Sequence, residues 1–211
     1  MSDRLYTVER GDGAAIVGRI IDVLFPDAET IIDATYGNGQ FWTGSRRCVV
    51  GMDRNPARAR DVCGDFTRLP FRTGAADLVV FDPPYITNPS KAGTCQMADR
   101  FGAYPSLLTM QASVEAGCRE AWRVARLGVL VKVQDQIRGA RWVEMTEWVR
   151  QAIGQPPYQR IDAIRNAPKI RGANWTDQLS AYGNGATYLA FRHGDQRHVR
   201  RRRPLAQEVV A

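Results

Sequence analysis

The chain of 211 residues has no long hydrophobic run. No apolar stretch approaches the roughly 20 residues that a membrane-spanning helix needs. The first residues, MSDRLYTVERGDG, contain no apolar signal-peptide core, so we expect a soluble, cytoplasmic protein. With 44% hydrophobic residues, the chain can fill the core of one globular domain, which we place at residues 1–195.

Cysteine and histidine are scarce. The four cysteines form no Cys-x-x-Cys pair, and the two histidines lie far from them near the C-terminus. A structural zinc site, or any other metal site, is therefore not expected, and reduced thiols are the better interpretation. The cysteines are Cys48, Cys63, Cys95 and Cys118, and the histidines are His193 and His198.

The glycine-rich motifs of two common cofactor classes are also missing. The pattern G-x-G-x-x-G would need glycine or alanine at Trp42, and no G-x-x-x-x-G-K-[ST] phosphate loop occurs. Nicotinamide and nucleoside triphosphate cofactors are therefore disfavoured. The segment ETIIDATYGNGQFW, residues 29–42, predicts instead a short strand that ends at Asp33 and a tight turn at Gly37-Asn38-Gly39. Glycines in such a turn let a ligand approach the main chain closely.

Two more aspartates end predicted strands. CVVGMDRNP closes on Asp53, about 20 residues after the first motif, where an α/β nucleotide-binding domain places the carboxylate that accepts hydrogen bonds from ribose. Asp65 ends a third short run in VCGDFTRLPF. An aspartate at that position fits equally well as the cap of a following helix.

The tetrapeptide Asp82-Pro83-Pro84-Tyr85 follows the apolar run ADLVVF. Prolines cannot donate to a sheet ladder, so the strand must stop here. An acidic residue, two prolines and an aromatic ring make a rigid corner with hydrogen-bond acceptors and a flat surface, which suits the amino group of a planar base. The same tetrapeptide also fits an ordinary strand-terminating turn.

Taken in order, D-x-x-x-G-x-G, Asp53, Asp65 and DPPY resemble the DPPY-type amino-methyltransferases, which use S-adenosylmethionine to methylate the adenine N6 or cytosine N4 amine of nucleic acids. The resemblance extends over most of residues 12–193. The first motif of that family usually reads D-P-F-x-G-x-G, whereas this chain has Ala34-Thr35-Tyr36 in the middle.

The resemblance implies an α/β, Rossmann-like methyltransferase fold. Its sheet should have seven strands in all, mostly parallel, of which the C-terminal strand is antiparallel, with helices on both faces. S-adenosylmethionine should be the cofactor. The residues expected to bind it are Asp33, Ala34, Tyr36, Gly37, Gly39, Asp53, Arg54, Asp65 and Phe66.

The resemblance also assigns catalysis to Asp82, Pro83, Pro84 and Tyr85. Asp82 and the Pro83 carbonyl should accept hydrogen bonds from the two amine N–H groups, while Tyr85 stacks on the base. We expect methylation of adenine in DNA. Methylation of cytosine N4 or of RNA, and a catalytically silent nucleic-acid-binding module, remain alternatives. The cytosine carbon-5 enzymes are set aside, because no cysteine of this chain stands next to proline.

The periodicity of apolar residues predicts the remaining elements. Helices are expected at residues 13–25 and 104–126, and a third should carry Trp142, Met145, Val149 and Ile153 on one face. Strands are expected near 30–34, 48–53, 61–65, 77–82 and 128–135, and a terminal hairpin near 159–166 and 186–193. The buried stripe expected on the long helix is Leu107, Met110, Val114, Cys118, Ala121 and Trp122.

The net charge of +7 and the sequence pI near 9.6 favour a polyanionic partner, and we expect nucleic acid, DNA above all. Two long loops, residues 86–104 and 167–185, combine basic with aromatic side chains, although each also fits a surface excursion without a role. Residues 196–211 form an arginine-rich tail that fits either an interaction arm or a solvated end. The expected substrate contacts are Lys91, Arg100, Phe101, Lys169, Arg171 and Trp175.

Overall fold

The computed structural model describes residues 4–87, 102–138, 141–164 and 185–194. In chain order the strands are β1 (Val8–Arg10), β2 (Thr30–Asp33), β3 (Cys48–Asp53), β4 (Val62–Cys63), β5 (Ala76–Phe81), β6 (Ala125–Val133), β7 (Gln136–Arg138), β8 (Arg141–Val143), β9 (Gln159–Ile164) and β10 (Gly185–Arg192). The helices are α1 (Gly13–Leu24), α3 (Leu107–Val124) and α4 (Met145–Ile153), with short 3-10 helices η1 (Gln40–Trp42) and η2 (Phe66–Arg68).

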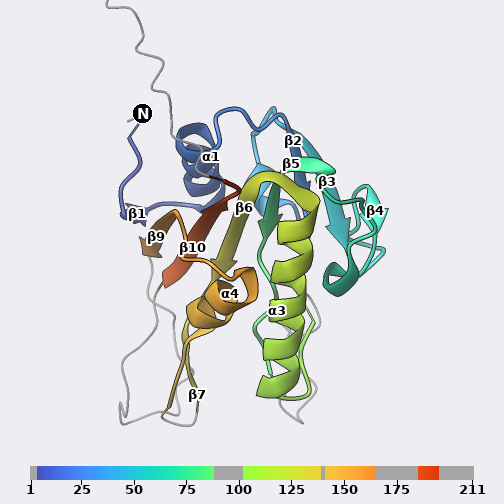
Figure 1. Ribbon diagram of the computed structural model, residues 1–211, viewed down its shortest axis with the longest axis vertical. Coiled ribbons are helices and arrows are strands. Elements are labelled where there is room, and N and C mark those ends of the chain that lie inside the picture. Colours follow the sequence, from blue (N-terminus) through green and yellow to red (C-terminus); the bar gives the residue numbers. More distant parts are fainter. Residues whose placement is uncertain (1–3, 88–101, 139–140, 165–184, 195–211) are drawn as a thin grey trace, which may run out of the picture.

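An eight-stranded sheet in the order β1-β9-β10-β6-β5-β2-β3-β4 forms the centre of the described structure (Figure 1). Strand β10 runs antiparallel to both of its neighbours, and the other pairings are parallel. The predicted α/β fold, with an antiparallel strand that closes the chain, is therefore confirmed.

The sheet has one strand more than the seven that we expected, because β1 pairs with β9 at the edge. No apolar pattern in the sequence marks this strand. Val8 is 54% exposed, whereas Glu9 is only 7% exposed and accepts a hydrogen bond of 2.7 Å from Arg19 in α1. A buried, ion-paired glutamate thus reverses the usual pattern of burial.

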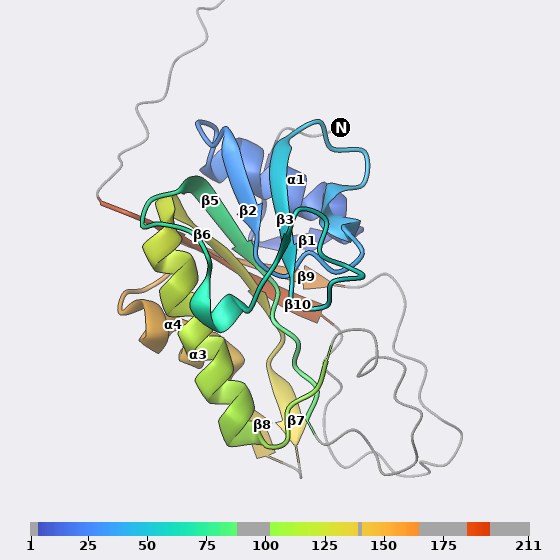
Figure 2. The ribbon, with the colours of Figure 1, turned by 90° about the vertical axis from the view of Figure 1, so that its right-hand side faces the viewer.

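Helices cover both faces of the sheet, as expected (Figures 1 and 2). Helix α1 lies on one face and buries an apolar stripe of isoleucine, valine and leucine side chains. Helices α3 and α4 lie on the other face, where their buried residues share a cluster with β5 and β6. No helix within the described ranges is long and apolar enough to span a membrane.

Some local predictions were wrong. Trp142 does not belong to a helix, because it lies in β8, which pairs antiparallel with β7, and it is 55% exposed. Met145, Val149 and Ile153 are buried on α4, as predicted. Helix α3 begins only at Leu107, where Ser106 and Thr109 form a capping box, and Leu107 itself is exposed. Strand β6 starts at Ala125, three residues earlier than expected.

Candidate active site

Four aspartates stand at or just after the carboxyl ends of adjacent parallel strands. Asp33 ends β2 and pairs in register with Val80 of β5 on one side and Gly51 of β3 on the other. Asp53 ends β3, Asp65 follows β4, and Asp82 follows β5. The strand order β5-β2-β3-β4 therefore brings all four to one edge of the sheet. In open α/β sheets, ligands bind at this edge, at the point where the strand order reverses.

The turn after β2 depends on glycine. Gly37 and Gly39 have φ values of 56° and 65°, in the left-handed region that favours glycine, so the predicted tight turn is confirmed. The ring of Tyr36 lies against Gly39 and Gly51, where an added Cβ atom would come within 2.5 Å of a ring or hydroxyl atom. Tyr36 therefore packs between the turn and β3, and its main-chain N–H donates to the carbonyl of Met52 at 2.8 Å.

Asp33 supports this turn from inside. It is 2% exposed, and its two oxygens accept hydrogen bonds from Trp42 Nε1 at 2.7 Å and from the Thr35 N–H at 3.0 Å. Burial raises the pKa of Asp33 to about 7, although both hydrogen bonds favour the ionised form. Ala34 is buried beside it, and its N–H donates to the Val80 carbonyl at 3.0 Å. Asp33 and Ala34 thus join the turn to β5 and to Trp42.

Asp53 connects β3 to the same turn. Its Oδ2 accepts a hydrogen bond of 2.9 Å from the Gly37 N–H, and its Oδ1 accepts one of 2.8 Å from the Asn55 N–H. Each carboxylate oxygen can accept more than one hydrogen bond. Asp53 can therefore still accept the hydroxyls of a ribose while it holds the turn.

Asp65 caps the 3-10 helix η2, which is the alternative role considered from the sequence. Its Oδ1 accepts hydrogen bonds from the Thr67 N–H at 2.8 Å and the Thr67 hydroxyl at 2.7 Å. Burial by itself would raise the pKa of Asp65, but these bonds and the charge of Arg54 outweigh it, so the pKa lies below its usual value. Phe66 points into the core, where its ring lies 5.1 Å from that of Phe81.

The main chain after β5 is fixed by a hydroxyl of the turn, because the Asp82 N–H donates to Thr35 Oγ1 at 2.8 Å. The Asp82 side chain is bound by Lys132 of β6, whose Nζ lies 2.7 Å from Oδ2. Burial alone would lower the pKa of Lys132, but the Asp82 carboxylate outweighs it and holds the pKa above its usual value. Lys132 therefore stays protonated.

The other oxygen of Asp82, Oδ1, is buried and has no hydrogen-bond partner among the described residues. An unsatisfied buried acceptor costs about 1–3 kcal/mol. An orphaned acceptor of this kind, at the edge where ligands bind, is the arrangement expected for a carboxylate that receives a donor from a ligand.

Tyr85 is held by the β7–β8 hairpin, which the sequence did not reveal. Its carbonyl accepts hydrogen bonds from Gln136 Nε2 and Arg138 Nη2, both at 3.1 Å. Its ring is half-buried at the edge of the core. Pro83 is buried and Pro84 half-buried, so the tetrapeptide is a fixed corner rather than a loose turn.

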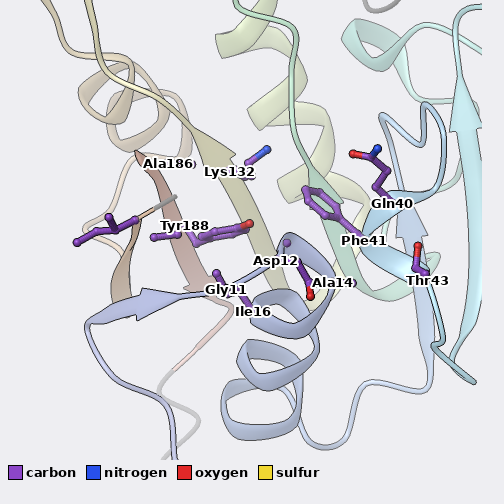
Figure 3. A pocket seen from close by; sticks show the side chains of 13 residues that line it. Gly11, Asp12, Ala14, Ile16, Gln40, Phe41, Thr43, Lys132, Ala186 and Tyr188 are labelled. Carbon is purple, nitrogen blue, oxygen red and sulfur yellow. The ribbon is translucent and has the colours of Figure 1, made fainter. Parts of the chain in front are cut away.

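A cavity of about 590 Å³ opens beside this corner, between the first turn of α1, η1, β6 and β10 (Figure 3). The side chains of Lys132, Phe41 and Tyr188 line it, together with main chain at Gly13. Lys132 Nζ lies 5.1 Å from the centre of the Phe41 ring. Because Lys132 also binds Asp82, it links the cavity to the corner.

Sequence reasoning missed Lys132, Trp42 and the hairpin as parts of the site. The signal for Lys132 was present, since it is the single charge within the apolar run GVLVKV. The predicted substrate contacts Lys91, Arg100, Phe101, Lys169, Arg171 and Trp175 all lie outside the described residues, as does the basic tail. Arg54, a predicted cofactor contact, is exposed beside Asp65.

Solved structures share this fold. The chain is similar to the Thermoplasma acidophilum 1320 protein, with 12% identity over 86% of this chain and 90% of that one, and a TM-score of 0.52. It is also similar to magnesium protoporphyrin IX methyltransferase from Synechocystis, solved with bound SAH, with 10% identity over 86% of this chain and 83% of that one, and a TM-score of 0.52. The fold is Rossmann-like, as in such methyltransferases. No protein-family model and no curated protein sequence matches the chain.

Proposed function

We propose that this protein is an S-adenosylmethionine-dependent methyltransferase that acts on the exocyclic amine of adenine in DNA. The observation that carries the proposal is the buried Oδ1 of Asp82, which has no hydrogen-bond partner within the described part of the chain and stands in a DPPY corner at the ligand-binding edge of a Rossmann-like sheet. An amine N–H is a donor that can satisfy such an acceptor.

The residues at this edge fit the cofactor. Asp53 can accept ribose hydroxyls, and the left-handed Gly37 and Gly39 let a ligand lie against the main chain. Within the described part of the chain, Asp65 Oδ2 makes no hydrogen bond and can meet the amino group of an adenine ring. The cavity of about 590 Å³ at the first turn of α1 falls within the range of small-molecule sites and can take the amino-acid end. The solved Synechocystis methyltransferase, which shares the fold, holds SAH. When bound, S-adenosylmethionine supplies an electrophilic methyl group on a sulfonium.

The residues of the chain orient the acceptor nitrogen. Asp82 Oδ1 and the carbonyl of Pro83 accept hydrogen bonds from its two N–H groups, which draws the lone pair out of the ring and stabilises the positive charge that develops on nitrogen. As the new nitrogen–methyl bond replaces the methyl–sulfur bond, one of these protons would pass to Asp82 Oδ1 and then to solvent. Lys132 fixes Asp82 from the opposite side through Oδ2, so the acceptor is already in place before substrate arrives. Tyr85 stacks on the base, a contact of about 1–3 kcal/mol, while its carbonyl is held by the hairpin.

The choice of substrate rests on the residues and charge of the chain. A net charge of +7 suits a polyanion. Aspartate rather than serine at the start of the tetrapeptide favours adenine over cytosine. A base inside a duplex is out of reach of this corner, so the enzyme must flip it out or act on single strands. The same fold serves a porphyrin in the Synechocystis enzyme, which shows that the site and not the fold sets the substrate.

The test is a methyl-transfer assay with labelled S-adenosylmethionine and separate duplex DNA, single-stranded DNA and RNA substrates, followed by digestion to nucleosides. We expect label in N6-methyladenine from DNA, and none with Asp82→Ala. Label in N4-methylcytosine or in RNA would show that the substrate is cytosine or RNA, while the proposed chemistry would still hold. Tight binding of the cofactor and of DNA without transfer to any of the three would favour the silent binding module.

A further inference from the structure

Strands β7 and β8 lie beside the DPPY corner. They pair antiparallel as a separate two-stranded sheet, and only two residues separate β7 from the end of β6. Figures 1 and 2 show this β7–β8 pair beyond the edge at which β5 and β6 end. Gln136 and Arg138 of β7 both donate to the Tyr85 carbonyl at 3.1 Å. The β7–β8 pair is therefore attached to the corner at the ligand-binding edge.

One face of the β7–β8 pair carries two arginines directly opposite each other. The register pairs Arg138 with Arg141, and the same face carries Gln136 opposite Val143, because residues two apart along a strand share a face. The Cβ atoms of directly opposite residues lie about 4.5–5.5 Å apart, and like charges in such positions destabilise a sheet. Positive charge is thus concentrated on the face that also contacts Tyr85.

No carboxylate neutralises these two arginines within the described part of the chain. Neither Arg138 nor Arg141 forms an ion pair there. Two carboxylates on adjoining segments are already bound, since Asp82 forms its ion pair with β6 and Asp135 accepts the N–H and the hydroxyl of Thr146. An anion from outside the chain would offset the repulsion between the two guanidinium groups.

The guanidinium of Arg138 is already oriented. Its side chain is half-buried, its Nη2 donates to the Tyr85 carbonyl, and its Nε donates to Gln136 Oε1 at 2.9 Å. A guanidinium has five N–H donors in a planar fork, so Nη1 still has donors for a ligand. Such a fork matches the oxygens of a phosphate, and Arg141, which is exposed, supplies a second one on the same face.

We propose that Arg138 and Arg141 bind a backbone phosphate next to the target base, on the DNA strand that carries this base. The proposal rests on the function proposed above. Because Arg138 is hydrogen-bonded to the residue on which the base stacks, the phosphate that it holds belongs to the target nucleotide or to its neighbour. The carboxylate of the cofactor does not compete for this site, since neither arginine lines the cavity proposed for the amino-acid end.

The first measurement is the affinity of the full chain for a single-stranded DNA oligonucleotide with one adenine, by fluorescence anisotropy at several salt concentrations. Arg138→Met and Arg141→Met should each weaken binding by about 2- to 10-fold. The double variant should lower the salt slope by about 0.7, the value for one phosphate on a single strand. Arg141→Lys keeps the charge and should retain most of the affinity.

A second oligonucleotide identifies the phosphate. It carries uncharged methylphosphonate linkages on both sides of the adenine. The wild type should bind it more weakly than the ordinary strand, whereas the double variant should bind the two strands about equally, because the contact is already missing. Methylphosphonates at the far end of the strand should instead affect both proteins by the same factor.

The matched control is Arg72, an exposed arginine shortly before β5, at the opposite end of the strands. Arg72→Met removes the same charge from the chain and should leave DNA affinity and the salt slope unchanged. Cofactor affinity, measured by calorimetry, should be the same in all variants. If Arg138→Met lowers it through Tyr85, Arg141→Met with the methylphosphonate strand provides the test by itself, because Arg141 makes no hydrogen bond to Tyr85 within the described ranges.

Unchanged DNA affinity in Arg141→Met would overturn the proposal, as would an equal loss in Arg72→Met or an equal effect of the methylphosphonates beside the adenine on wild type and variant. Dependence on the two arginines with RNA but not with DNA would overturn the choice of DNA. The two proposals fail separately. A chain that binds DNA through these arginines but transfers no methyl group contradicts only the proposed function, whereas methylation with a normal KM in the double variant contradicts only the phosphate site.

Discussion

Lys132 and Asp82 form an ion pair of 2.7 Å across neighbouring strands, and this pair fixes one oxygen of the carboxylate, while the other has no partner among the described residues. The contact follows from the β5–β6 register, in which Phe81 pairs with Val131, so that the next residues also lie opposite each other. The ion pair thus sets the direction in which Asp82 can receive a ligand.

Lys132→Met should lower kcat by at least about 10-fold and destabilise the fold by about 1–3 kcal/mol, because it leaves a largely buried carboxylate unpaired. Lys132→Arg keeps the charge and should retain part of the activity. In the double variant Asp82→Asn/Lys132→Met, stability should recover while activity stays lost, since no unpaired charge remains. Urea unfolding and steady-state kinetics measure both effects, and a single variant with normal kcat would remove Lys132 from the site.

Asp82→Ala should abolish methyl transfer and leave cofactor affinity nearly intact, because Asp82 acts on the substrate amine in the transition state. Calorimetry with S-adenosylmethionine and the nucleoside assay measure the two properties. If both are lost together, Asp82 shapes the fold or binds the cofactor instead.

Asp53→Ala should weaken cofactor binding by about 10-fold or more, since hydrogen bonds of roughly 1–3 kcal/mol to the ribose are lost. The change also removes the acceptor of the Gly37 N–H. Asp61→Ala is the matched control. Asp61 also accepts a hydrogen bond from a glycine N–H, that of Gly51 at 2.7 Å, but it does not stand at the carboxyl end of β3. Equal losses of affinity in the two variants would assign Asp53 to the turn and not to the cofactor.

The stability of the protein should depend on the ionisation of Asp33. Its folded pKa of about 7 lies above the ordinary 3.8. The stabilisation of the fold that comes from the protonated form is therefore fully present below about pH 4 and is lost as pH rises toward 7. The loss amounts to about 4 kcal/mol. Trp42→Phe removes a hydrogen bond that favours the ionised form, so the decrease in stability should occur at higher pH. Asp33→Asn should abolish this pH-dependent decrease. Urea unfolding between pH 4 and 9 measures the stability of the wild type and of both variants. Identical dependence of stability on pH in all three would contradict this role of Asp33.

Truncation after His193 removes the arginine-rich tail. If those arginines bind phosphates, affinity for all nucleic-acid sequences should fall about equally, and the salt slope should decrease by a little under one unit for each phosphate that is no longer bound. Activity at saturating substrate should survive. Equal slopes for the full and truncated chains would assign the tail to solvent.

The sequence predicted the strands of the site well, because each one is an apolar run that ends at an acidic residue. It could not predict the contact of Lys132 with Asp82, which arises from the register of two strands about 50 residues apart. Trp142 was wrongly predicted to be helical because its spacing to Met145, Val149 and Ile153 is that of a helix. In the structure it lies in β8, before α4 begins. Strand β1 was not predicted because its buried side chain is a glutamate rather than an apolar residue.

Thr35 connects the Gly37–Gly39 turn to the DPPY corner, because its hydroxyl accepts a hydrogen bond from the Asp82 N–H while its own N–H donates to Asp33. Under the proposed function, a shift of the turn when the cofactor binds should therefore also move the main chain of Asp82. Two ligands whose binding segments are connected in this way should be energetically coupled. The coupling is reciprocal: if the cofactor changes the affinity for the base by some factor, the base changes the affinity for the cofactor by the same factor. Thr35→Val, which keeps the shape and removes the acceptor, separates the two binding events.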